Sequence, residues 1–305
     1  MILLWGLTED ACMNMALNEL ERSGADFVFL DHRKIFSSDI EYTFNAESGE
    51  KCILQSDGKT FDLSKIKVVY LRPYNFFDFE EMQNKTIDDP LAIKAAGFEM
   101  QLFAYLDASN VVVINKSDSS ATNASKPYQL AIIKSFGLNI PETFISNDNE
   151  AVRKFLHVYN DTVYKSISGV RSIVQKLSDS HLQYLNDVSW CPTLFQNFID
   201  GVNYRAHVIG DNVITVRIQS DKLDYRYGNT TMIAEELPAE IAEKCRKLNS
   251  ILGLHFSGID LMRAAGDQWY CLEVNPSPAY SYFELNGYVP ISVALAKYMI
   301  DADHR

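Results

Sequence analysis

The sequence predicts a mixed α/β protein that begins with an open, mostly parallel β-sheet. Its strands are expected at four short apolar segments: residues 2–5, 27–30, 68–71 and 111–114. Helical segments separate these strands. One helix is expected to be capped by Thr8 and to end at Gly24, and another is expected over residues 91–106. Residues 41–63 are less regular and predict a hairpin. Strands that alternate with helices are typical of a parallel sheet.

Two α+β units are expected to follow this sheet. The first begins near Lys116 and contains a helix capped by Ser125, with Pro127 in its first turn. Its strands are expected at residues 140–145, 162–165 and 173–177. The second unit begins near Gln196 and carries two hairpins. We therefore predict three tightly packed domains: residues 1–115, 116–195 and 196–305.

The composition fits a folded protein and argues against two classes of partner. Hydrophobic residues make up 47% of the 305 residues, which is ample for a core. Lys and Arg number 28 against 40 Asp and Glu, so the formal net charge is -12. An acidic protein lacks the basic footprint that binds duplex nucleic acid or an anionic membrane, so neither is expected as the main partner.

The cysteines and the first residues of the chain point to a reducing compartment. The five cysteines are odd in number, far apart, and show no C-x-x-C pairing. We expect them to be reduced, and a disulfide framework is not expected. The segment MILLWGLTED lacks the basic region of a signal peptide, and no stretch of about 20 apolar residues occurs. The sequence therefore predicts a cytoplasmic protein that does not cross a membrane. A homo-oligomer is left open.

The segment FSGIDLMRAAGDQWYCLEVNPSP predicts a hairpin that gathers acidic side chains. With a turn at residues 265–268, Asp260 lies opposite Glu273 and Gly258 lies opposite Asn275. Since side chains alternate along a strand, Asp260, Glu273 and Asn275 share one face. Opposed carboxylates repel unless a cation compensates, and their oxygens are suited to Mg²⁺ bound with phosphate. The structural alternative is a solvated polar face.

The segment NYRAHVIGDNVITVRIQS predicts a second hairpin. A three-residue loop at residues 210–212 aligns the apolar side chains of both strands on one face. The other face then carries Arg205 opposite Arg217. Two facing guanidinium groups favour an anion between them, such as a polyphosphate or an acyl phosphate. The structural alternative is a surface pair neutralised by nearby acids.

These segments, in this order, resemble the ATP-grasp superfamily, and most of all its RimK-type and glutathione-synthetase-type carboxylate–amine ligases. The matching pieces are Lys126, VYKSISGVRSIV, QNFIDGVNYRAHVIG, RIQSDKLDYRYG and GIDLM with EVNPSP. They span residues 115–284, and the last pair is the most specific. The resemblance implies an ATP-grasp fold, in which two α+β lobes clasp ATP after an N-terminal Rossmann-like domain.

The resemblance also implies roles for individual residues. ATP would be bound by Lys126 and Lys165 at its phosphates, by the loop with Ser166 and Gly169, and by the linking segment Gln196, Asn197, Phe198 and Ile199. Asp260, Glu273 and Asn275 match the Mg²⁺ ligands, with Mn²⁺ as a substitute, and Arg205 and Arg217 match catalytic positions near the transferred phosphate. Arg72, Arg226 and Ser277 are candidate substrate contacts. For Arg72 a structural ion pair is an equal alternative.

The resemblance implies an ADP-forming enzyme. ATP would convert a carboxylate into an acyl phosphate, and an amine acceptor would then form an amide. The carboxylate could belong to an amino acid, a peptide or a protein. Three alternatives stay open at this point: an ester-forming peptide-modifying enzyme, a small-molecule kinase, and an ATP-binding regulatory protein without turnover.

Overall fold

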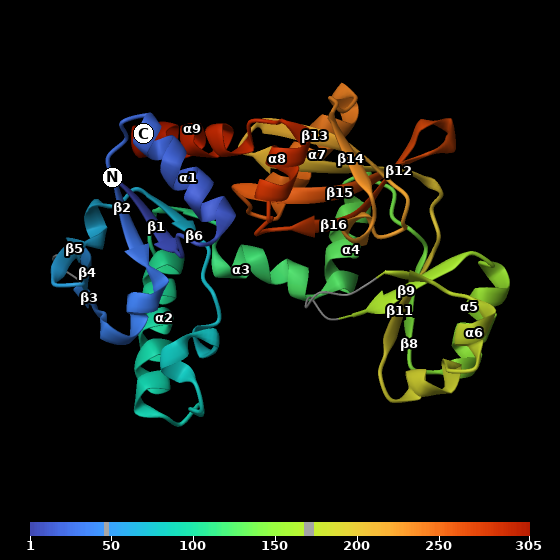
Figure 1. The fold of residues 1–305 in the computed structure, drawn as a ribbon, viewed down its shortest axis with the longest axis horizontal. Helices are drawn as coiled ribbons and strands as arrows, with labels where there is room; N and C mark the ends of the chain where they lie inside the picture. Colours follow the sequence, from blue (N-terminus) through green and yellow to red (C-terminus); the bar gives the residue numbers. More distant parts are fainter. Residues whose placement is uncertain (46–48, 168–173) are drawn as a thin grey trace. The chain divides into compact units, whose positions relative to one another are not determined.

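A computed structural model describes residues 1–45, 49–167 and 174–305 (Figure 1). The described chain forms two compact units. Unit 1 contains Met1–Ser117 together with Ile291–Arg305, and unit 2 contains Asp118–Pro290. The last helix, α9 (Ile291–Asp303), therefore belongs with the N-terminal part of the chain. The predicted division at residue 195/196 falls inside unit 2 and stays a prediction.

Unit 1 is built on the predicted parallel sheet. Its four strands lie in the order β2 (Phe27–Asp31), β1 (Ile2–Gly6), β6 (Val68–Leu71) and β7 (Val112–Ile114), and every adjacent pair is parallel. Helix α1 (Ala11–Arg22) follows β1, and helix α2 (Pro90–Ala108) precedes β7. All five residues of β1 are buried, because both faces of a parallel sheet are covered. The predicted α/β sheet is thus confirmed.

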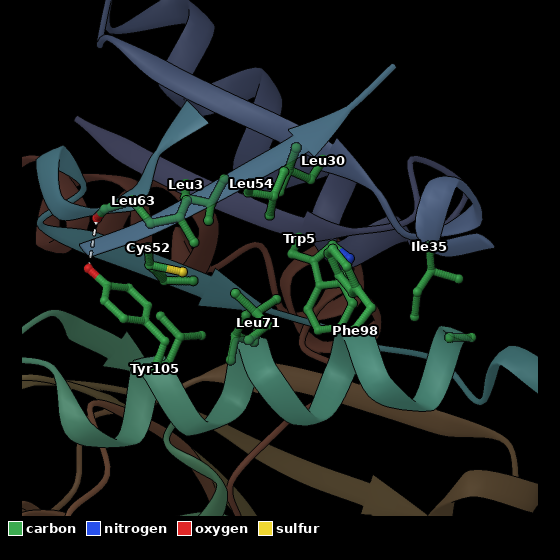
Figure 2. Close-up of a cluster of buried hydrophobic side chains, with 14 of the residues drawn as sticks. Leu3, Trp5, Leu30, Ile35, Cys52, Leu54, Leu63, Leu71, Phe98 and Tyr105 are labelled. Carbon is green, nitrogen blue, oxygen red and sulfur yellow. Dashed lines mark hydrogen bonds between the residues drawn. The ribbon is translucent and has the colours of Figure 1, made fainter. Parts of the chain in front are cut away.

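A second, antiparallel sheet completes the core of unit 1. It consists of β3 (Asp39–Asn45), β4 (Gly49–Ser56) and β5 (Lys59–Asp62), so the hairpin expected at residues 41–63 is three strands instead of two. Figure 2 shows Leu3 and Trp5 of β1 packed in one cluster with Leu54 of β4 and Phe98 of α2. The hydroxyl of Tyr105 donates to the carbonyl of Leu63 at 3.0 Å, which satisfies a polar group inside this cluster.

Helix α1 begins two residues later than predicted. Asp10, and not Thr8, is its N-cap, and the Asp10 carboxylate accepts the amides of Cys12 and Met13 at 2.8 and 3.0 Å. A carboxylate at this position satisfies amides that have no partner in the helix and lies at the positive end of its dipole.

Unit 2 contains two further sheets. The first has the order β10 (Gln175–Lys176), β9 (Thr162–Ser166), β11 (Thr193–Asn197) and β8 (Thr143–Ser146). The second has the order β14 (Thr230–Ala234), β13 (Asn212–Ser220), β12 (Gly201–Ile209), β15 (Phe256–Ala264) and β16 (Gln268–Asn275). The helices are α4 (Lys126–Ser135), α5 (Asn149–Val158), α6 (Asp179–Leu182), α7 (Ala239–Ile251) and α8 (Ser281–Gly287), and α3 (Ser117–Ser120) crosses the unit boundary.

The five-stranded sheet has two different faces. One face packs with α4 and α7 in an apolar core that includes Tyr204, Ile259 and Val274. The other face carries Arg205 and Asp260, which are neighbours on β12 and β15. This separation of an apolar face from a charged face places the charged residues of unit 2 on one side of the sheet.

Within the described residues, none of the helices has the length and apolar character needed to cross a membrane.

Candidate functional site

Unit 2 contains a cavity of about 590 Å³. It lies among β9, β11, β12, β15, β16, α4 and α8. Most of the residues predicted for the site line it: Lys126, Lys165, Gln196, Asn197, Phe198, Ile199, Arg205, Asp260, Glu273 and Asn275. Ser166, Arg217 and Ser277 are not among the described lining residues. Gly169 and the side chain of Arg226 lie outside the described part of the structure. Folding thus gathers ten predicted residues around one space.

The register of the carboxylate hairpin agrees with the prediction at the site. Asp260 pairs with Glu273, and Gly258 pairs with Asn275. Nearer the turn the predicted register is wrong. A regular hairpin with the predicted turn at residues 265–268 would pair Met262 with Cys271, but a β-bulge shifts the pairing by one residue beyond Asp260, and Met262 pairs with Tyr270. A bulge inserts one unpaired residue and changes which side chains face each side.

The bulge has a direct effect on the cavity. Leu272 and Glu273 are consecutive in the chain, and yet both line the cavity. On the other side of the bulge, Trp269 and Cys271 belong to the apolar core, although regular alternation from Glu273 would have turned them toward the site. The bulge therefore adds an apolar side chain beside the carboxylates.

Arg205 is the most buried charged group of the site. Its side chain lies over Gly258 and pairs with Asp260, with Nη1 to Oδ1 at 2.7 Å. Its guanidinium carbon lies 5.3 Å from the centre of the Phe283 ring. The Nε atom has no hydrogen-bond partner within the described residues. Burial lowers the pKa of Arg205 and Asp260 raises it, and the balance is an increase, so the group stays cationic.

Gly258 is required by this arrangement. A Cβ atom at position 258 would meet the Arg205 guanidinium carbon at 2.5 Å, well inside van der Waals contact. We therefore expect Gly258→Ala to displace Arg205, to destabilise the protein by about 1–3 kcal/mol, and to lower turnover about 10–100-fold. Chemical denaturation and the rate of ADP release check these two effects.

Gly97→Ala in α2 is the matched control for this substitution. A Cβ atom at position 97 would meet nothing within 4 Å beyond the backbone of its own helix, and alanine favours a helix. The substitution should leave turnover unchanged and stability equal or higher. Unchanged stability and turnover in Gly258→Ala would contradict the requirement for glycine at position 258.

The predicted Arg205–Arg217 clamp is wrong. The turn between β12 and β13 has two residues instead of three, and Gly210, with φ of 53°, occupies its first position. Arg205 therefore pairs with Val216, whereas Arg217 pairs with Tyr204 on the opposite face. There the Arg217 Nε atom donates to Glu235 at 2.6 Å. The register could not be read from alternation, because both faces of β12 are covered and apolar residues occur on each.

Lys126 and Lys165 enter the cavity from different elements. Lys126 is the first residue of α4, and Lys165 lies near the end of β9; both side chains are buried. The Lys126 ammonium lies 3.7 Å from a carboxylate oxygen of Glu273. Burial lowers the pKa of Lys165, Lys126 lowers it further, and Glu273 and Asp260 oppose this without reversing it. The cavity thus concentrates positive charge next to two carboxylates.

The linking segment between β11 and β12 forms one end of the cavity. Thr143 donates to the carbonyl of Pro141 at 2.8 Å, so its oxygen can accept from Gln196 Nε2 at 2.9 Å. This chain orients the Gln196 amide. The buried Oδ1 of Asn197 has no partner within the described residues, and Lys176 lies 4.7 Å from the centre of the Phe198 ring. This end combines the Phe198 ring with one buried acceptor, Asn197 Oδ1, that has no donor within the described residues.

Asn275 has a structural contact that the sequence did not indicate. Its Oδ1 atom accepts the amide of Ser277 at 2.9 Å, which is an Asx turn. A carboxamide oxygen has two lone pairs, so one is left for another ligand. Ser277 is exposed, and its amide serves this turn.

Arg72 lies in unit 1, where the structural alternative for it is observed. Its Nε atom donates to Asp10 at 2.9 Å, and the hydroxyl of Tyr74 donates to the same carboxylate at 2.9 Å. Burial raises the pKa of Asp10, but Arg72 and the hydrogen bonds lower it more, and the balance is a decrease. Arg72 therefore holds the capping residue of α1 in place, and a substrate contact stays a prediction.

Sequence reasoning missed several residues of the site. The aromatic residues Tyr282 and Phe283 line the cavity, together with Tyr225, which lies in the segment RIQSDKLDYRYG that the resemblance had already matched. So does Asn123, whose buried Oδ1 has no partner within the described residues. The run AYSYFEL just after the Asn-Pro-Ser-Pro turn was an available signal for α8, because it follows the carboxylate strand directly.

His207 was also not singled out. It is fully buried on the Arg205 face of β12, and its ring nitrogens have no hydrogen-bond partner in the described chain. Burial and the charge of Arg205 lower its pKa well below the usual value, so the ring is neutral. A neutral ring adds no second charge next to Arg205.

The side chains of the cavity fit Mg²⁺ and a nucleoside triphosphate. Mg²⁺ is usually held by one or two carboxylates together with phosphate oxygens, and Asp260 and Glu273 are paired carboxylates on one sheet face. The described residues include no group of three or more His, Cys, Asp or Glu that could hold a metal without such help. The cations Lys126, Lys165 and Arg205 match the charge of the phosphates.

A cavity lined by strands of two sheets, with cations for phosphates and carboxylates for a metal, is typical of an α+β nucleotide-binding protein. The ATP-grasp domain model matches residues 124–280, about half of the chain and all of the cavity's strands. The chain belongs to the ATP-grasp family. This confirms the resemblance at the level of the superfamily, while the RimK type stays a prediction.

Solved structures share the whole fold. The ATP-grasp ligase PsnB complexed with its minimal precursor superimposes with a TM-score of 0.82 at 25% identity, covering 99% of this chain and 98% of that chain. A Chryseobacterium gregarium RiPP-associated ATP-grasp ligase gives 0.84 at 21% identity over 98% and 96%. The macrocyclase MdnC of Microcystis aeruginosa gives 0.82 at 19% identity over 99% and 100%. The predicted fold class is confirmed.

A curated relative shares part of the sequence. The uncharacterized protein MJ0776 of Methanocaldococcus jannaschii is 28% identical over 203 residues, which are 64% of this chain and 51% of the relative. The chain thus spans about half the length of this relative.

Proposed function

We propose that this protein is an ATP-dependent ligase that activates a carboxylate of a peptide and joins it to an amine. The observation that carries the proposal is the opposed pair Asp260 and Glu273 within one cavity with Lys126, Lys165 and Arg205. Two carboxylates and three cations around a space of about 590 Å³ suit a metal-bound polyphosphate.

Each group has a place in this proposal. The linking segment Gln196–Ile199 holds the adenine ring, and Lys126 and Lys165 bind the phosphates. Asp260, Glu273 and Asn275 hold Mg²⁺, or Mn²⁺ in its place, which neutralises phosphate charge when bound. Arg205 lies beside this site, where its buried charge stabilises the negative charge that develops during transfer.

The reaction follows from these positions. An oxygen of the substrate carboxylate attacks the γ-phosphorus of ATP, the bond to the bridging oxygen breaks, and ADP leaves. The amine nitrogen then attacks the carbonyl carbon of the acyl phosphate. The carbon–oxygen bond to phosphate breaks, inorganic phosphate leaves with the electron pair, and the nitrogen gives its proton to water. Positioning and charge neutralisation supply most of the acceleration in such reactions.

The relatives support a peptide as substrate. PsnB has been solved with a minimal precursor, Mg and ADP, and with the precursor peptide PsnA2 and AMPPNP. MdnC has been solved with the precursor peptide MdnA. Their similarity over almost the whole chain favours a peptide carboxylate here over a free amino acid. The nucleophile is proposed to be an amine, and an alcohol, which would give an ester, is the alternative to be tested.

Hydroxylamine trapping tests this proposal. The protein is incubated with Mg-ATP, hydroxylamine and a pool of peptides that carry Asp, Glu and free C-terminal carboxylates, without added acceptor. An acyl phosphate should be intercepted as a hydroxamate, with ADP formed in equal amount. Mass spectrometry identifies the peptide and the position of the added group. Repeating the reaction with lysine-containing and with serine- or threonine-containing peptides then separates amide from ester formation.

Other outcomes identify the alternatives. A kinase that phosphorylates a hydroxyl would release ADP and yield a phosphopeptide without hydroxamate. A regulatory protein would bind ATP and release no peptide-dependent ADP. Either result would contradict carboxylate activation.

A further inference from the structure

A band of charge divides the cavity of unit 2 into two ends. Arg205, Asp260 and Glu273 are register partners on β12, β15 and β16, so they lie in a row across the sheet. The strands continue past this row in both directions, at about 3.3 Å per residue. The two ends of the cavity therefore have separate walls.

One end adjoins the linking segment. Asn203, Met262 and Leu272 line the cavity on this side of the charged row. β12 starts at Gly201, two residues after Ile199, which places the linking segment at the same end. In the proposed function this end takes the adenine ring, and the phosphates extend from it to the charged row.

The other end carries an aromatic wall, defined here as Tyr225, Tyr282 and Phe283. Beyond the charged row, β16 ends at Asn275, and Tyr282 and Phe283 follow on α8. The ring centres of Tyr282 and Phe283 are 5.5 Å apart, and those of Tyr225 and Phe283 are 6.2 Å apart. All three residues line the cavity. The rings thus form one continuous surface that contacts Arg205 through Phe283.

The wall combines a buried support with an accessible ring. Phe283 is 6% exposed, whereas Tyr282 is 40% exposed and still lines the cavity. Contact between the partly exposed Tyr282 ring and an apolar group of a ligand is favourable, because it removes apolar surface from water. The neighbouring Phe283 ring restricts the motion of the Tyr282 ring. The base of the nucleotide does not supply this apolar group. In the proposed function the base lies at the linking segment, and the phosphates extend only as far as the charged row.

We propose that the aromatic wall binds an aromatic or large aliphatic side chain adjacent to the carboxylate that is activated. This inference rests on the proposed function, since it assigns a feature of the peptide substrate. The carboxylate lies at Arg205 and the metal carboxylates, and its neighbour along the peptide reaches Tyr282. The wall selects among acidic peptides by the residue next to the reacting acid.

Two peptides test this selection. They share one sequence with a single reacting carboxylate and carry either Phe or Ala next to it. Initial rates of ADP formation give kcat and KM for each. We expect the Phe peptide to have a KM about tenfold lower at similar kcat, the size expected for one apolar side chain in a pocket. Tyr282→Ala should remove this difference by raising KM for the Phe peptide alone.

Leu285→Ala is the matched control on the same helix. Leu285 is 65% exposed on α8 and is not among the described lining residues. It should leave the KM difference intact, which separates a role of the wall from a general effect on α8. The Tyr282→Ala protein should also retain the KM for ATP, because the nucleotide lies at the other end.

The results that overturn the inference are distinct. Turnover of both peptides with equal KM overturns the aromatic wall as a selective site and leaves the proposed function standing. An equal loss of selectivity in Leu285→Ala also overturns it. No peptide-dependent ADP from the unsubstituted protein, with these peptides and the pool, overturns the proposed function and this inference together.

Discussion

Replacing Glu273 with glutamine is expected to lower Mg-ATP-dependent turnover about 100–1,000-fold, a loss typical of removing one charged group from a phosphoryl-transfer site. Glutamine keeps the size of the side chain and can still accept a hydrogen bond, so the hairpin should retain its register. The charge that would hold the metal is lost. ADP release at saturating peptide, measured across a Mg²⁺ titration, checks the effect.

Glu273 is a better target for this test than Asp260. Asp260 is the ion-pair partner of buried Arg205, and its neutral variant would leave an uncompensated buried charge, which destabilises proteins strongly. Glu273 is only partly buried, and its partner Lys126 lies 3.7 Å away. Loss of activity in Glu273→Gln can therefore be separated from loss of the fold.

Glu240→Gln provides the control for the Glu273 variant. Glu240 is an exposed residue of α7 that pairs with Lys244, so its loss should leave turnover and thermal stability close to those of the unsubstituted protein. Full activity of Glu273→Gln at low Mg²⁺ would show that this carboxylate is not a metal ligand.

Replacing Lys165 with methionine is expected to lower ADP and hydroxamate formation together, by about 100-fold or more, because its charge stabilises the transferring phosphate in the proposed reaction. Methionine keeps much of the length of lysine and suits a buried position. The exposed Lys154→Met on α5 is the control and should retain activity.

The same substitution should not reduce stability at neutral pH. The pKa of Lys165 is lowered mainly by burial, so the folded protein binds this proton more weakly than the unfolded chain. The protonated lysine therefore destabilises the fold below its folded-state pKa. This cost is relieved as the pH rises from the folded-state pKa toward the unfolded-state pKa.

Thermal unfolding over a pH series measures this effect. At neutral pH, Lys165→Met should unfold at the same temperature as the unsubstituted protein or at a higher one. The advantage of the variant should shrink as the pH rises through the folded-state pKa. If Lys165→Met is clearly less stable at neutral pH, the attraction of the nearby carboxylates for the Lys165 charge outweighs the free-energy cost of burying that charge.

The carboxylate hairpin shows how far alternation along a strand can lead. Asp260, Glu273 and Asn275 were placed correctly because their polarity distinguishes one face of the hairpin from the other, and Gly258 followed as the register partner of Asn275. Near the turn, apolar residues occupy consecutive positions, so the sequence does not distinguish a regular register from a bulge at Leu272. With the bulge, Trp269 and Cys271 pack in the apolar core with α4 and α7.

The second hairpin shows where the same reasoning is wrong. β12 lies between two sheet neighbours, with a core on one face and α8 on the other, so apolar residues on both faces satisfy either register. Gly210 adopts a left-handed conformation that suits a two-residue turn, and this turn separates Arg205 from Arg217. Both registers start the turn at Gly210, and they differ only in whether Asn212 belongs to the turn or, as observed, pairs with Ile209 in the sheet.

The sequence by itself determined the parallel sheet of unit 1 and the charged face of the carboxylate hairpin, because periodicity and residue chemistry are local properties of the chain. Its resemblance to the ATP-grasp superfamily indicated most of the predicted residues that line one cavity. Only the tertiary structure decided that Arg205 lies over Gly258 against Phe283, that Arg217 faces away, and that aromatic residues of α8 and the 225 region form a wall. These features depend on register and on contacts between distant segments. Their energies come from packing, which no local pattern specifies.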